Sequence, residues 1–182
     1  MNVTLIGMPG CGKTTNGIFL ARAAGMRFLD TDREIEHQTG RKLADLAAEL
    51  GTEGFRDLEG RVIAGLDVDG CVISTGGSAV YRPEAMDRLR ALGRVIYLRL
   101  REETVEERVR DPGARGVSLR AGQSLRDLMA ERAPLYETYA DDILDVDGLL
   151  PRETVPRLLA LIRPDAGTGQ RTATDEKEET GP

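Results

Sequence analysis

Short apolar runs alternate with stretches of helical period along most of the chain. Each run has the length and composition of a buried strand. The runs cover residues 3–6, 26–29, 71–74, 94–98 and 143–146. Strands that alternate with helices usually lie parallel in one sheet, so this order predicts an α/β fold with a parallel sheet.

The expected helices fill the segments between these runs. Pro83 suits the first turn of one helix, and Ser124 with Asp127 has the spacing of a capping pair at the start of another. The insertion at residues 31–66 is long for a doubly wound fold, and its place in the chain would allow it to hold a second substrate. The predicted helices cover residues 13–24, 31–66, 102–110, 124–139 and 151–163, with a further helix from Pro83.

Two stretches lack this periodicity. Residues 111–123 (DPGARGVSLRAGQ) contain one proline and three glycines, which predicts a mobile loop. Residues 165–182 contain no residue that is both larger and more apolar than alanine, so burial cannot offset the entropy of ordering them. We therefore expect one domain at residues 1–164 and a disordered acidic tail at residues 165–182.

Composition narrows the possible partners. With 182 residues, of which 40% are hydrophobic and 31% charged, the chain has the make-up of a soluble globular protein. It has no apolar run near the roughly 20 residues that span a bilayer, and no signal-type N-terminus. A net charge of −6 does not favour nucleic acid. Cys11 and Cys71 give neither a disulfide framework nor a metal-site spacing, which favours the cytoplasm. We expect a monomer that binds small molecules.

The segment GMPGCGKT, residues 7–14, lies between the first strand and the first helix. It matches the phosphate-binding P-loop at every fixed position and in the required strand–loop–helix context. Glycines let backbone N–H groups converge on phosphate oxygens, while the lysine bridges the terminal phosphates and the threonine hydroxyl ligates Mg²⁺. The sequence therefore predicts binding of ATP with Mg²⁺. The candidate residues are Gly10, Cys11, Gly12, Lys13, Thr14 and Thr15.

Further features favour a small kinase over a switch or a motor. The chain has no Asn-Lys-x-Asp motif for reading guanine, and the strand at residues 71–75 carries no Walker-B aspartate. Asp30 and Asp32 follow the second strand, at the sheet edge where ligands bind in open α/β folds. One carboxylate there could serve Mg²⁺ and the other a substrate hydroxyl. The alternative is helix capping, for which Thr31-x-x-Glu34 has the pattern of a capping box.

Five segments together resemble the shikimate kinase family, in that family's order and spacing, over roughly residues 3–162. The resemblance implies a three-layer P-loop kinase fold with a five-stranded parallel sheet in the order 2-3-1-4-5, a helical acceptor-binding insertion at residues 31–63, and a lid at residues 111–123. It also implies transfer of the γ-phosphoryl group of ATP to the 3-hydroxyl of shikimate, a step of aromatic amino acid biosynthesis. The segments are GMPGCGKTT, FLDTDREIEHQTGRKLADL, GTEGFRDLEGRVI, VISTGGSAV and RAPLYETYAD.

The resemblance also implies roles for individual residues. Asp32 would hold the acceptor hydroxyls and act as the base, and Asp30 would serve Mg²⁺ beside Thr14. Arg56 and Arg132 would clamp the acceptor carboxylate, which suits the guanidinium fork. Independently of the resemblance, Arg132 lies on the apolar stripe of its predicted helix, where an arginine is costly without a negative partner, unless it snorkels to the surface.

The remaining implied roles concern the glycines, the lid and one glutamate. Gly76 and Gly77 would let the backbone approach the acceptor closely. Arg115 would be the lid arginine over the phosphates, and Glu59 would hold Arg56 in place. Glu59 falls on the same helical stripe as Phe55, although surface pairing is an alternative for it.

Two departures from the family pattern affect the choice of acceptor. The family usually has three consecutive glycines where this chain has Gly76, Gly77 and Ser78. Its lid usually carries Arg-Pro-Leu-Leu, which is missing here, so Arg115 is assigned by position and Arg120 is an alternative. Either departure could mark a subfamily that acts on a related hydroxylated carboxylate. The alternatives to a shikimate kinase are a kinase of the same fold with another hydroxy-acid or nucleotide acceptor, and a non-catalytic nucleotide-binding regulator.

Overall fold

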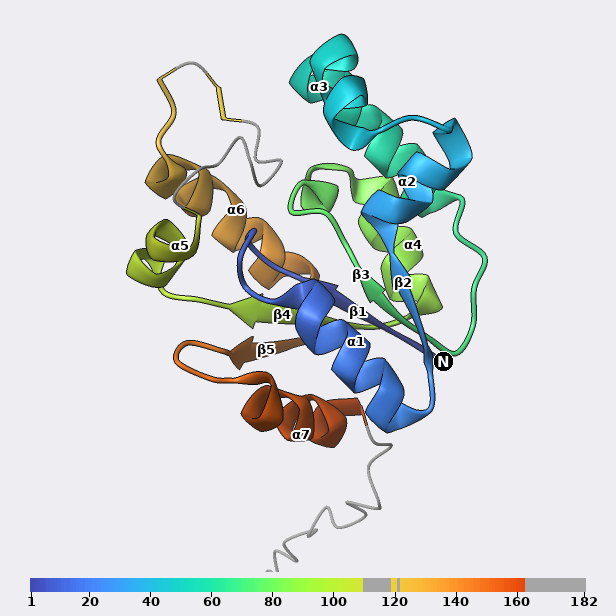
Figure 1. Cartoon of the computed structure of the whole chain (residues 1–182), viewed down its shortest axis with the longest axis vertical. Helices are drawn as coiled ribbons and strands as arrows, with labels where there is room; N and C mark the ends of the chain where they lie inside the picture. The colour runs from blue at the N-terminus through green and yellow to red at the C-terminus, as the bar shows by residue number, and fades with distance from the viewer. Residues whose placement is uncertain (110–118, 121, 163–182) are drawn as a thin grey trace, which may run out of the picture.

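Five parallel strands form the central sheet of the protein, for which a computed structural model describes residues 1–109, 119–120 and 122–162. The strand order is β2-β3-β1-β4-β5, as the family resemblance implied (Figure 1). Pairing is in register along the central strands, where Leu5 lies opposite Ser74 on one side and Ile96 on the other. The strands are β1 (Asn2–Ile6), β2 (Arg27–Asp30), β3 (Cys71–Ser74), β4 (Gly93–Arg99) and β5 (Asp142–Asp145).

Helices cover both faces of this sheet and complete the three layers. Helices α1 and α7 pack together on one face, while α4 and α6 lie on the other (Figure 1). Helices α2 and α3 pack on each other and rise above the carboxyl ends of β2 and β3 (Figure 1). The helices are α1 (Lys13–Ala24), α2 (Thr31–Thr39), α3 (Leu43–Ala64), α4 (Pro83–Leu92), α5 (Glu102–Arg108), α6 (Leu125–Tyr139) and α7 (Pro151–Ile162), with a 3₁₀ turn η1 (Ala79–Tyr81).

The hydrophobic core explains which strands occupy the centre. Every residue of β1 and β3 is buried, as expected for parallel strands covered on both faces. A separate small cluster around Ile35, Leu46 and Val62 holds α2 against α3. Helices α2 and α3 therefore have their own apolar packing, beside the main core.

The structure confirms the predicted α/β alternation and corrects some boundaries. The predicted helical stretch 31–66 is two helices, because Gly40 adopts a left-handed conformation (φ 66°) that ends α2. Within α3, Gly51 (φ 65°, ψ −177°) introduces a kink. Ser124 and Asp127 form the predicted capping box of α6. The predicted capping by Thr31 is wrong, because Asp30 is the N-cap of α2 and its side chain accepts from the Asp32 N–H.

Some predictions fall outside the described residues. These are the tail at residues 165–182 and most of the lid, residues 111–118 and 121. Among the described residues, no helix has the length and apolar character needed to cross a membrane.

Candidate active site

The P-loop joins β1 to α1 at the carboxyl edge of the sheet. Gly10 and Gly12 have φ values of 83° and 90°, which only glycine adopts without strain, and the loop curls around the side chain of Lys13. Lys13 is 8% exposed, and its ammonium donates to the carbonyls of Gly7 (2.8 Å) and Met8 (3.0 Å). Helix α1 begins at Lys13, so its positive N-terminal end faces the hollow of the loop.

Oxygen ligands gather beside the P-loop, from the first turn of α1 and from the ends of β2 and β3. The Thr14 hydroxyl donates to Asp30 Oδ2 at 3.1 Å and lies 3.4 Å from the Ser74 hydroxyl. Hydroxyl and carboxylate oxygens suit Mg²⁺, which binds few protein groups and otherwise uses water and phosphate oxygens. Among the described residues, no group of three or more His, Cys, Asp or Glu could hold a metal alone. The donor set therefore fits Mg²⁺ that arrives with a nucleotide.

Asp30 and Asp32 lie on the two sides of the β2–α2 junction and have different surroundings. Asp30 has two tasks, since one oxygen caps α2 and the other accepts from Thr14. Thr31 is fully buried and its hydroxyl accepts from the Gly76 N–H at 3.2 Å, which ties α2 to the loop after β3. Burial and the neighbouring Asp30 carboxylate raise the pKa of Asp32 to about 6. That carboxyl is therefore placed to exchange a proton near neutral pH.

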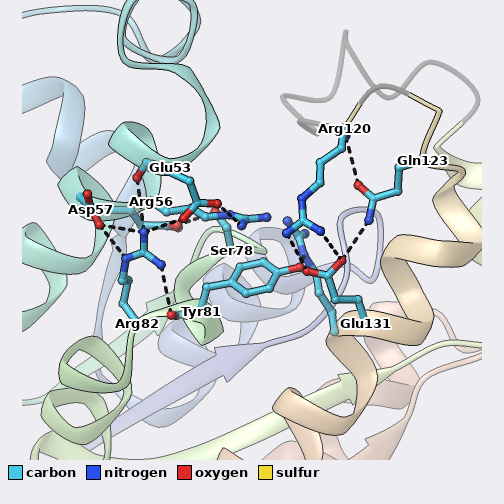
Figure 2. A network of polar contacts seen from close by, with 11 residues as sticks. Glu53, Arg56, Asp57, Ser78, Tyr81, Arg82, Arg120, Gln123 and Glu131 are labelled. Atoms are coloured by element: carbon cyan, nitrogen blue, oxygen red, sulfur yellow. Dashed lines mark hydrogen bonds and ion pairs between the residues drawn. The ribbon is translucent and has the colours of Figure 1, made fainter.

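Two buried arginines approach each other from α3 and α6. Arg56 and Arg132 are only 5% and 4% exposed. Their Cζ atoms lie 3.7 Å and 5.3 Å from the ring centroid of Tyr81, so both guanidinium groups gather around one aromatic side chain. Figure 2 shows this ring at the centre of a polar network. Arg132 Nε also donates to the Tyr81 hydroxyl at 3.3 Å.

The segment after β3 lies against charged side chains of α3 and α6 and needs its glycines for this close packing. A Cβ at Gly76 would collide with the Glu59 carboxylate, and one at Gly77 would lie 2.9 Å from an Arg132 guanidinium nitrogen. Tyr136 donates to the Gly77 carbonyl at 2.7 Å and fixes this backbone from α6. The glycines therefore let charged side chains from α3 and α6 reach the backbone.

One cavity of about 970 Å³ connects the P-loop with the arginines. Its wall includes residues from α1, β2, β3, α3 and α6 that are far apart in the sequence. The predicted site residues on this wall are Gly10, Cys11, Gly12, Lys13, Thr14, Thr15, Asp30, Asp32, Arg56, Gly76, Gly77 and Arg132.

Known proteins resemble this chain over most of its length. The model of the shikimate kinase family matches residues 9–163. The chain is 43% identical over 141 residues to a shikimate kinase of Symbiobacterium thermophilum, covering 75% of this chain and 81% of that protein. It is 40% identical over 164 residues to that of Pseudomonas syringae pv. tomato, covering 87% and 94%. The chain belongs to the shikimate kinase family.

Solved structures of this family have the same fold. Shikimate kinase from Acinetobacter baumannii, in complex with shikimate, superposes with a TM-score of 0.79 at 32% identity, covering 88% of this chain and 92% of that one. Shikimate kinase from Aquifex aeolicus gives a TM-score of 0.77 at 29% identity, covering 88% and 95%. The chain is therefore a phosphotransferase, an ATP-binding kinase of aromatic amino acid biosynthesis.

Some of the expected contacts of this shikimate kinase fold differ in the structure. Glu59 does not hold Arg56, because Arg56 donates to Glu53 at 2.6 Å. Glu59 instead accepts from the Ser78 hydroxyl. The alternative lid arginine, Arg120, pairs with Glu131 at 3.3 Å. Arg115 lies outside the described residues.

Two functional candidates were not predicted from the sequence: Ser74, which lines the cavity, and Tyr81, whose ring contacts the two arginines of its wall. Ser74 ends β3, the strand that carries no Walker-B aspartate, and its hydroxyl lies 3.4 Å from that of Thr14. Tyr81 follows the glycine segment by four residues, which places an aromatic ring at the carboxyl edge of the sheet. Both residues could have been identified from their place after a predicted strand, because ligands of open parallel sheets bind at the carboxyl edge.

Proposed function

We propose that this protein transfers the γ-phosphoryl group of ATP to the 3-hydroxyl of shikimate, with Mg²⁺, and gives ADP and shikimate 3-phosphate. The observation that carries the proposal is the convergence of Arg56 and Arg132 in the same cavity as the P-loop. Two buried cations suit one carboxylate of the acceptor. The similar shikimate kinase from Acinetobacter baumannii, solved in complex with shikimate, supports the same acceptor.

In the proposed complex the two guanidinium groups bind the acceptor carboxylate and fix the orientation of its ring. Paired guanidinium–carboxylate hydrogen bonds are strong and directional, and burial strengthens them. Gly76 and Gly77 keep the wall beside the acceptor free of side chains. In this proposal residues 1–164 form the kinase domain, and residues 31–63 are its acceptor-binding part.

On the nucleotide side, the P-loop N–H groups and Lys13 bind the phosphates. Gly10, Cys11, Gly12 and Thr15 contribute backbone groups, and the loop lysine balances charge on the transferred group. Thr14 and Asp30 would hold Mg²⁺, with Ser74 beside them; when bound, the ion screens the phosphate charges. Arg115 is proposed as the lid arginine from its place in the sequence alone.

The transfer step needs one proton acceptor. The acceptor oxygen forms a bond to the γ-phosphorus while the bond from that phosphorus to the β,γ-bridging oxygen breaks, and ADP leaves. The hydroxyl proton passes to Asp32, whose raised pKa of about 6 suits a base near neutral pH. Most of the catalysis is positioning and charge stabilisation.

The proposal also includes a monomer in the cytoplasm. Nucleotide and acceptor candidates come from one chain and line one cavity. Cys11 and Cys71 are free and buried, which agrees with a reducing compartment. Light scattering of the purified protein measures its oligomeric state, and a reporter fusion shows its location in the cell.

A coupled assay of ADP release tests the function. Purified protein is given ATP and Mg²⁺ with shikimate, with other hydroxy acids and with nucleoside monophosphates. We expect turnover with shikimate at a kcat/KM at least tenfold above that of any other acceptor. No turnover with shikimate would refute the proposed acceptor, and ATP binding without any turnover would favour a regulator.

A further inference from the structure

Ser78, the residue that interrupts the family's glycine run, makes one hydrogen bond that the known activity does not explain. Its hydroxyl donates to Glu59 Oε2 at 2.5 Å and joins the start of η1 to the C-terminal half of α3 (Ser78 is labelled in Figure 2). Ser78 is the N-cap of η1 but its side chain caps no backbone N–H. The hydroxyl therefore has no role in the turn itself, and its contact is with the carboxylate.

Glu59 is in an unusual position for an acidic residue. It is 1% exposed, and its second oxygen, Oε1, has no hydrogen-bond partner among the described residues. That oxygen rests against the backbone of Gly76. The charged groups around it are Asp32 from α2, Arg56 from α3 itself and Arg132 from α6. A buried carboxylate with one donor is costly unless a further donor or cation is found.

The two cations near Glu59 are the ones assigned to the acceptor. Neither forms an ion pair with Glu59: Arg56 pairs with the exposed Glu53, and Arg132 donates to the Tyr81 hydroxyl. Without the Ser78 hydroxyl, Glu59 would gain most by turning toward one of these guanidinium groups. It would then compete with the acceptor carboxylate for the same donors.

We propose that Ser78 is a positioning residue of the acceptor pocket, whose hydroxyl holds the Glu59 carboxylate against Gly76 and so leaves Arg56 and Arg132 available to the acceptor. The inference rests on the proposed function, since it assumes that these arginines bind the acceptor. It also gives Ser78 a task that a glycine at this position cannot perform.

The test is a double-mutant cycle between Ser78 and Glu59. Ser78→Ala and Ser78→Gly both remove the hydroxyl, and comparing them separates its loss from the effect of the Cβ. Glu59→Gln keeps an oxygen that can accept from Ser78 but removes the negative charge. For each protein, KM for shikimate and for ATP and the melting temperature are measured, and calorimetry gives Kd for shikimate.

We expect Ser78→Ala and Ser78→Gly each to raise KM and Kd for shikimate about five- to tenfold, within the range of the net contribution of one ordinary hydrogen bond, with KM for ATP within twofold. In the Glu59→Gln background, Ser78→Ala should change KM for shikimate by less than twofold. A purely structural role would lower the melting temperature and alter both KM values together.

Two results would overturn the inference. One is a KM for shikimate that is unchanged in both Ser78 variants. The other is a Ser78→Ala substitution that raises KM for shikimate by the same factor in wild type and in the Glu59→Gln background. Wild-type turnover of shikimate in the same assay separates this from the proposed function: its absence refutes both, whereas normal wild-type turnover with either result refutes only the role of Ser78.

Discussion

The nucleotide region, residues 7–15, and the acceptor region, centred on Asp32, Arg56, Tyr81 and Arg132, are built in opposite ways. The proposed nucleotide region is one continuous segment, and its proposed binding groups are mostly backbone N–H groups of a loop whose glycines have positive φ. The acceptor region takes side chains from α2, α3, η1 and α6, and it holds several charges away from water. Backbone recognition is thus fixed locally, whereas side-chain recognition depends on how distant helices pack.

The largest expected effect comes from the one side chain that the nucleotide region cannot replace. Lys13→Ala should lower kcat/KM by about 10²–10³-fold, the usual cost of removing one group that stabilises developing charge. Lys42→Ala is a matched control, because that side chain is 78% exposed and pairs only with Glu36 among the described residues. Loss of activity without a large fall in melting temperature would confirm a role in transfer, and equal effects of the two variants would contradict it.

The acceptor region also buries the Glu59 carboxylate, and this burial should make the stability of the protein depend on pH. Burial raises the pKa of Glu59 to about 7 from an ordinary value of 4.5. The folded protein thus binds this proton more tightly than the unfolded chain does, so the associated stability is present below pH 4.5 and is lost as pH rises through about 7. The free energy of unfolding should fall by up to about 3 kcal/mol across this range because of Glu59.

Glu59→Gln should remove that dependence. Urea denaturation of wild type and variant at pH 5 and at pH 8 measures it. Asp32 titrates in the same direction in both proteins, so the difference between them isolates Glu59. If the difference in free energy of unfolding between wild type and Glu59→Gln is the same at pH 5 and at pH 8, Glu59 is already charged at pH 5.

The sequence predicted these two regions unequally, for the same physical reason that separates them. The strands, α1 and the P-loop follow from local patterns, and the predicted helix at residues 13–24 has the observed bounds. The break at Gly40 was missed because helical apolar spacing continues on both sides of it. The pairing of Glu59 with Ser78, 19 residues away, depends on how α3 packs against η1, which no local pattern encodes.

The third prediction separates acceptor from nucleotide binding. Arg132→Ala should raise KM for shikimate about 10–100-fold, the loss of hydrogen bonds to a charged group, and KM for ATP much less. Arg126→Ala is the control on the same helix, because that side chain is 64% exposed and pairs with Glu102. Equal changes in both KM values for Arg132→Ala would contradict the division into two regions.

The smallest expected effect tests the aromatic ring that the two arginines share. Tyr81→Leu should raise KM for shikimate about two- to fivefold, because contacts of this kind between a cation and an aromatic face contribute about 0.5–1 kcal/mol where water reaches them. Tyr81→Phe keeps the ring and loses the hydroxyl that accepts from Arg132 and contacts Glu131, so it separates ring from hydroxyl. If Tyr81→Phe raises KM for shikimate as much as Tyr81→Leu does, the hydroxyl is the group that positions the two guanidinium groups. If both variants bind shikimate normally, the arginines are held by their helices alone, and packing of α3 and α6 is sufficient to build the acceptor region.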